Sequence, residues 1–119
     1  MGNELHASRA SHEQLTELLS PSSQIRRLRV LDDAMRGTIC AGDIITVDTG
    51  NRDIDSGHCY LVVSEGAVRV RRLSFEGAVL SVNADSPDKT SYPDAIVAAG
   101  ADDFVVLGRV IDRQGDKGL

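Results

Sequence analysis

A β-hairpin is encoded in the segment CYLVVSEGAVRVRRL, residues 59–73. Two runs rich in Val and Leu, 59–64 and 67–73, flank the dipeptide Glu65-Gly66. A two-residue connection that ends in glycine is typical of a tight turn between antiparallel strands. The segment therefore predicts two paired strands in the middle of the chain.

The pattern of short β-strands extends in both directions from this hairpin. Leu28 and Val30 alternate with Arg27 and Arg29, which suits a half-buried strand. Glycines punctuate the apolar runs, as expected at turns. Further strands are predicted at 44–47, 78–82 and 104–111, and the punctuating glycines are Gly50, Gly57, Gly66, Gly77 and Gly100. The pattern predicts a mostly β domain built from short strands.

The composition fits one globular domain. A chain of 119 residues, 41% of them apolar, can bury a modest core. The net charge of −5 argues against a DNA-binding face, since phosphate contacts need clustered Lys and Arg. We expect a cytoplasmic protein, because the chain has neither a bilayer-length apolar run nor the apolar core of a secretion signal. The aromatic residues are too few for base stacking and comprise Tyr60, Phe75, Tyr92 and Phe104.

The N-terminal segment is expected to lie outside the β domain. A capping-box pattern at 11–14 precedes leucines at helical spacing, and Pro21 should end this short amphipathic helix. The helix either packs on a partner or is the remnant of an upstream domain. We therefore divide the chain into a flexible segment with helix and linker, residues 1–24, and a β domain, residues 25–119.

The two cysteines give no sign of a metal site. Cys40 and Cys59 lack the Cys-x-x-Cys spacing of zinc ligands. His58 adjoins Cys59, but neighbours on a strand point to opposite faces. We expect two reduced, partly buried thiols, with no metal and no cofactor.

Four landmarks occur in order along the chain, and together they are informative. They are Asp33-Ala34-Met35 with Gly42-Asp43, the arginine-rich strand at 68–73, LSVNAD at 80–85 and VLGRV at 106–110. Together they resemble the C-terminal domain of LexA and of phage CI-type repressors, a family of self-cleaving Ser/Lys peptidases. The resemblance covers roughly residues 25–111 and implies a β fold of that type, preceded here by one short helix. It also implies dimerisation and, in active members, a serine nucleophile with a lysine base.

Both catalytic positions implied by the resemblance carry inert residues. The serine position is Ala34, and the lysine position is Arg71. A methyl group cannot attack a peptide carbonyl. A guanidinium stays protonated, so it cannot take the proton of a hydroxyl. The two lysines, Lys89 and Lys117, lie outside any Val-x-Val strand, so we expect a catalytically inactive member.

Two further observations bear on whether the loss is natural. By resemblance, the cut site is an Ala-Gly or Cys-Gly pair upstream of the serine, and no such pair precedes Ala34. Ala34 alone would fit an enzyme trapped in an uncleaved form. Arg71 is a second inactivating change where one suffices, so a natural pseudo-enzyme is the preferred interpretation.

The arginine at the lysine position also predicts a structural pair. By resemblance Arg71 approaches Ala34 and its neighbours Asp32 and Asp33. A guanidinium there could bind one of these carboxylates. The alternative is a solvated charged face that contributes little to stability.

The closing strand predicts self-association. Phe104, Val105, Val106 and Leu107 form an unbroken apolar run, whereas a half-solvated strand would alternate. We expect this run to form an oligomer interface. The alternative is a central strand that is covered within one copy.

The expected function is that of the oligomerisation and regulatory domain of a phage or prophage transcriptional repressor that does not cleave itself. DNA would be bound through an N-terminal domain that this sequence does not contain. The expected partners are a second copy and an antirepressor protein, with no membrane partner. Two alternatives stay open, namely a self-cleaving peptidase whose nucleophile was replaced at Ala34 and a free-standing interaction protein.

Overall fold

The domain is one β-sheet of eight strands. A computed structural model describes residues 4–5, 24–98 and 100–115, and no helix occurs among them. The strands are β1 (Glu4–Leu5), β2 (Ile25–Val30), β3 (Ile44–Asp48), β4 (His58–Ser64), β5 (Ala67–Glu76), β6 (Val79–Asn83), β7 (Ala95–Ala98) and β8 (Phe104–Gln114). All neighbours pair antiparallel except β1 and β2, which are parallel. The predicted β fold is confirmed.

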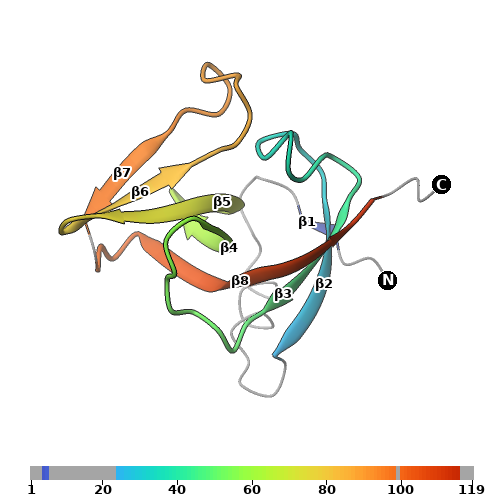
Figure 1. The fold of residues 1–119 in the computed structure, drawn as a ribbon, viewed down its shortest axis with the longest axis horizontal. Coiled ribbons are helices and arrows are strands. Elements are labelled where there is room, and N and C mark those ends of the chain that lie inside the picture. Colours follow the sequence, from blue (N-terminus) through green and yellow to red (C-terminus); the bar gives the residue numbers. More distant parts are fainter. Residues whose placement is uncertain (1–3, 6–23, 99, 116–119) are drawn as a thin grey trace.

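The long strand β8 holds the sheet together. The strand order is β1-β2-β3-β8-β4-β5-β6-β7, so β8 lies between β3 and β4. Figure 1 shows β8 crossing the molecule from the half that contains β4 to β7 to the half that contains β1 to β3. Register shifts at Thr46/Val47 and Leu61/Val62 interrupt both of its pairings. Bulges of this kind bend a sheet, which lets one sheet enclose two cores.

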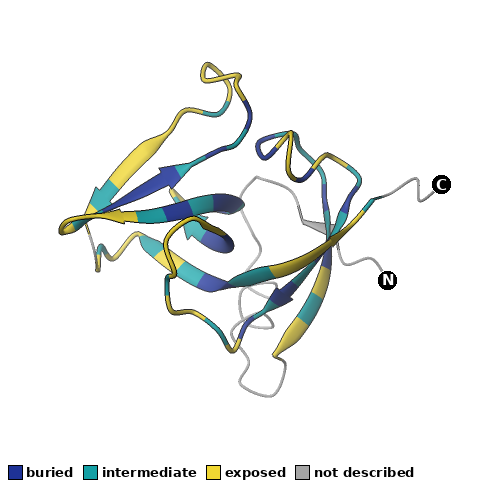
Figure 2. Ribbon diagram, viewed as in Figure 1, coloured by how far each residue is buried: buried dark blue, intermediate teal, exposed yellow. Residues whose placement is uncertain are grey.

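The apolar side chains form two clusters rather than one. The first packs Leu28, Ile45 and Met35 against Val68 and Val70. The second gathers Tyr60, Val62, Leu73, Leu80 and Val82. Because side chains alternate along a strand, β4 and β5 contribute to both clusters. Figure 2 shows the burial concentrated in the middle of the sheet and the exposed residues at strand ends and on β7.

The hairpin turn has the predicted conformation. Glu65 and Gly66 both have positive φ angles, 54° and 77°. Two central residues with positive φ are typical of the type I′ turn, whose twist matches that of paired strands. The β4–β5 pair it joins runs in unbroken register from His58↔Leu73 to Ser64↔Ala67.

The N-terminal and edge regions differ from the expectation in two places. Glu4 and Leu5, expected in a flexible segment, form a strand parallel to β2, where main-chain groups at the sheet edge can pair. The predicted helix at 11–20 lies outside the described residues. The edge strand β7 was not predicted. No helix in the described part of the chain is long and apolar enough to cross a membrane.

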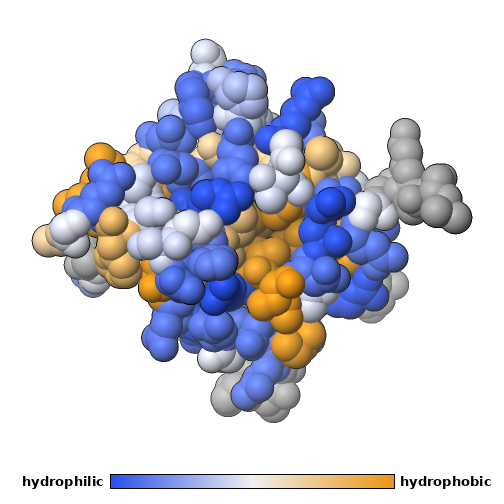
Figure 3. Space-filling view, in the orientation of Figure 1, coloured by the Kyte–Doolittle hydropathy of each residue, from blue (hydrophilic) through white to orange (hydrophobic). Residues whose placement is uncertain are grey.

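The surface mixes charged and apolar side chains. Figure 3 shows apolar patches set among charged groups, one of them on the side of the molecule where β6 and β7 lie. Scattered apolar exposure is usual for soluble domains. Among the described residues, the large apolar side chains that reach the surface are Ile25, Phe75, Ile96, Val105 and Ile111.

Candidate functional site

The loop between β2 and β3 holds Ala34 in a fixed position near its start. Met35 and Ile39 are buried in the first core cluster and anchor the loop. The Ala34 amide donates to Asp32 Oδ1 at 3.1 Å, and the Ala34 carbonyl accepts from the Ser86 amide at 2.9 Å. Ala34 is only 1% exposed. The position that resembles the serine site is therefore a buried, hydrogen-bonded turn.

The Gly-Asp landmark closes this loop. The Gly42 amide donates to the Val30 carbonyl at 2.6 Å, and the Val30 amide donates to the Asp43 carbonyl at 2.8 Å. The Asp43 carboxylate is buried and accepts from the Cys40 amide at 2.8 Å. Gly42 has a φ of 94°, a conformation that favours glycine. The hydrogen bonds of this landmark hold the backbone of the loop in place.

Arg71 on β5 is buried, at 5% exposed. Its Nη1 donates to the Val70 carbonyl at 2.8 Å. Burial, and next the charge of Arg69, lower the pKa of the Arg71 guanidinium, while Asp32 partly opposes this. Asp32 thus links Ala34 and Arg71, because it accepts a hydrogen bond from the Ala34 amide and acts electrostatically on Arg71.

In the described part of the chain, the Arg71 guanidinium makes no hydrogen bond or ion pair with the carboxylates of Asp32 and Asp33, its expected partners. Asp33 Oδ1 instead accepts from the Ala41 amide at 3.0 Å. The structure therefore brings Arg71 and Asp32 into electrostatic range without joining them.

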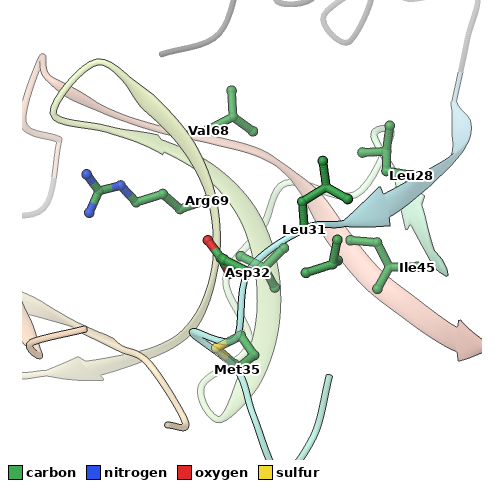
Figure 4. Close-up of a pocket in the computed structure, with 9 residues that line it drawn as sticks. Leu28, Leu31, Asp32, Met35, Ile45, Val68 and Arg69 are labelled. Carbon is green, nitrogen blue, oxygen red and sulfur yellow. The ribbon is translucent and has the colours of Figure 1, made fainter. Parts of the chain in front are cut away.

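A small cavity is lined by residues of β2 and β5 and lies beside Asp32 and Arg69 (Figure 4). Asp32 Oδ2 and Arg69 Nε are both buried and have no hydrogen-bond partner among the described residues. The cavity has a volume of about 20 Å³. A space of roughly 10–15 Å³ admits one water molecule, so this cavity is too small for an organic ligand.

Arg72 on β5 makes a charged contact that sequence reasoning missed. Its Nη2 and Nε donate to the two carboxylate oxygens of Asp85, at 2.6 and 3.0 Å. Thr38 donates to the same carboxylate at 2.5 Å, and Arg72 Nη1 donates to the Gly57 carbonyl at 2.6 Å. Arg72 therefore ties together three loops. Asp85 is 13 residues away along the chain, so no local pattern could reveal this pair.

The ion pair between Asp85 and Arg72 should make the stability of the fold depend on pH. The hydrogen bond from Arg72 lowers the pKa of Asp85 below its ordinary value of 3.8. A carboxyl with a lowered folded-state pKa stabilises the fold above its unfolded pKa and loses that effect as pH falls through the folded-state value. Asp85→Asn should cost about 1–2 kcal/mol at pH 7 and less below about pH 4, measured by urea unfolding at both pH values.

The matched control for Asp85→Asn is Asp102→Asn, which changes an exposed carboxylate on the turn before β8. Such a surface change should alter stability by less than about 0.5 kcal/mol at either pH. Equal stability of Asp85→Asn and the wild type at pH 7 would contradict a contribution from the pair.

A comparison with protein-family models matches most of the chain. The model of the Peptidase S24-like family matches residues 3–111. The chain belongs to the Peptidase S24-like family. The match includes both core clusters and all strands from β1 to most of β8. A search of curated proteins gave no match.

Within this Peptidase S24-like domain the predicted interface residues divide between core and surface. Phe104 and Val106 pack against the second cluster, and Leu107 is fully buried in the first. Val105 is 41% exposed. The run pairs with β4 along one edge, whereas the pairing of β8 with β3 begins only at Arg109. Val105 is the most exposed member of the run, and Phe104 and Val106 are partly exposed.

The remaining predicted groups are not assembled into a metal centre. Cys59 is buried and Cys40 is exposed, and both are free thiols. Burial raises the pKa of the Cys59 thiol, with Arg72 opposing in part. No cluster of three metal-ligating side chains occurs among the residues that the structure describes.

Proposed function

We propose that this domain is the regulatory and oligomerisation module of a phage or prophage transcriptional repressor, and that it does not cleave itself. The observation that carries the proposal is a Peptidase S24-like domain with Ala34 and Arg71 at the two positions that resemble the catalytic ones. The net charge of −5 supports a role other than direct DNA contact.

The chemistry behind the proposal follows from the two side chains. Self-cleavage needs an oxygen nucleophile and a neutral base within reach of its proton. Ala34 has no oxygen beyond its main chain. The Arg71 guanidinium has donors only, and one of them is already bound to the Val70 carbonyl. Although burial lowers the pKa of the Arg71 guanidinium, an arginine side chain stays charged near neutral pH.

The protein should therefore remain intact under conditions that favour self-cleavage. The longest natural form is incubated at high pH, with and without activated RecA, and its mass is followed over time. We expect no specific cut upstream of Ile25, and a cut there would contradict the proposal.

Restoring the two side chains separates a natural pseudo-enzyme from an enzyme with one replaced residue. Ala34→Ser alone should stay inert, because Arg71 cannot deprotonate the hydroxyl. Ala34→Ser combined with Arg71→Lys should regain slow cleavage when a cleavable Ala-Gly segment is supplied. Rapid cleavage by Ala34→Ser alone would instead support the alternative of a peptidase whose nucleophile was replaced.

Without self-cleavage, control of such a repressor would come from binding. Dimerisation raises the local concentration of two weak DNA-binding heads without any new contact to DNA. A partner that disrupts the dimer, such as an antirepressor, would then induce transcription. Sedimentation at micromolar concentration tests the first step, since a monomer would contradict the oligomerisation part of the proposal.

A further inference from the structure

A second cavity is lined by residues of β5, β6 and β7, Arg71 among them. It has a volume of about 230 Å³ and is lined from β5 by Arg69 and Arg71. Val82, Val97 and Phe104 form an apolar wall. Glu65 and Asp103 line it too, and both are exposed, so the cavity reaches the surface. Its volume is more than ten times that of the cavity beside Asp32, about 20 Å³.

Arg71, which lines this cavity with Arg69, has hydrogen-bond donors that no described residue accepts from. Arg71 is more than nine-tenths buried, yet within the described part of the chain only its Nη1 is bonded, to the neighbouring Val70 carbonyl. Five N–H donors belong to each guanidinium, so most of those on Arg71 are uncommitted. A buried charge without a bonded counter-charge costs free energy, and a bound anion removes that cost.

The acidic groups around the cavity do not neutralise Arg71 directly. Glu65 contacts Arg69, at 3.8 Å, and its side chain is 77% exposed. Asp94 is bound to Lys89 at 2.9 Å. Asp32 and Asp94 act on Arg71 only through their charges. Among the described residues, the Arg71 guanidinium is therefore the charged group in this cavity that has no bonded counter-charge.

We propose that this cavity binds a small aliphatic carboxylate, with its head group on Arg71 and Arg69 and its hydrocarbon tail against Val82, Val97 and Phe104. A guanidinium donates two parallel hydrogen bonds to a carboxylate, which suits the planar head group. The apolar wall gains from burying the tail. The site lies where the resemblance places a catalytic base, but it requires no repressor role and stands apart from that proposed function.

Binding of three probes to the wild-type protein tests both halves of the site. By calorimetric titration at constant ionic strength, valerate should bind with a Kd on the order of 1 mM. Acetate has the head group and lacks the tail, so it should bind at least about tenfold more weakly than valerate. Inorganic phosphate tests whether the site accepts any oxyanion. Phosphate binding tighter than valerate would overturn the choice of a carboxylate, and no binding of valerate beyond a chloride control would overturn the site.

Matched variants then locate the charge. Arg71→Gln should weaken valerate binding by about tenfold or more, because it removes charged hydrogen bonds. Arg27→Gln makes the same change on β2, at an exposed side chain bonded to Gln114, and should leave binding unchanged. Equal binding by Arg71→Gln and the wild type would overturn the proposal.

A measurement on the wild type alone decides the question if Arg71→Gln does not fold. Valerate should shift the NMR signals of the Arg71 side-chain N–H and of the Val82 and Val97 methyl groups, with the Leu28 methyl signals unchanged as an internal reference. Shifts confined to other residues would overturn the assignment of the site. Neither the binding titration nor the NMR shifts depend on self-cleavage, so this inference can fail while the proposed function stands.

Discussion

Leu107→Asp is expected to unfold the domain. Leu107 is fully buried in the first core cluster, on the strand that pairs with both β3 and β4. The change removes a core side chain and buries a carboxylate for which the apolar cluster offers no partner. The cost should be about 5 kcal/mol or more, which matches the whole stability of many small domains. Circular dichroism and urea unfolding measure the loss of structure.

Val105→Asp is the matched control, two residues away on the same strand. Val105 is 41% exposed, so its carboxylate stays solvated and the domain should remain folded. If Leu107→Asp gave a folded monomer, Leu107 would belong to an interface rather than to the core. If Val105→Asp shifts a dimer to a monomer in sedimentation, Val105 lies in the contact between copies.

Gly108→Ala is expected to cost about 3 kcal/mol, because the position has no room for a side chain. An added Cβ would lie 2.6 Å from the Asp48 carbonyl oxygen and 2.9 Å from Thr49 Cα. Both are backbone atoms of the adjacent strand and turn, so relief requires moving β3 away from β8. Urea unfolding should show the loss as a lower midpoint with an unchanged slope.

Gly115→Ala provides the control for the loss of a glycine on the same part of the chain. Its added Cβ would find its nearest neighbour at 3.7 Å, the flexible end of Arg113. The change should alter stability by less than about 0.5 kcal/mol. Equal effects of the two substitutions would contradict a steric origin for the Gly108 effect.

The β fold could be predicted because its signals are local. The β4–β5 hairpin follows from alternation and from a dipeptide whose positive φ angles suit a tight turn. Edge strand β7 escaped prediction because it has only four residues, Ala95–Ala98, without alternation and close behind Pro93. The apolar run in β8 fitted either an interface or a central strand. The structure pairs the run with β4 and buries Leu107 in the core, while the interface stays a prediction.

The candidate site could be predicted only in part, for a similar reason. The inert character of Ala34 and Arg71 is chemical and needs no coordinates. The partner of each arginine depends on which strand face it occupies and on loops distant in sequence. Arg72 binds Asp85, while Arg71 next to it faces the second cavity, because consecutive strand residues point to opposite sides.

The position of β8 also sets the order in which the domain can assemble. Strands β4, β5 and β6 follow one another and pair with sequence neighbours, so this meander can form early. Strands β3 and β4 gain their shared partner only when β8, the last strand of the sheet, has left the ribosome. Until then each exposes an unpaired edge, and such edges promote aggregation. Translation speed and chaperone access should therefore influence the yield of this domain more strongly than its final stability suggests.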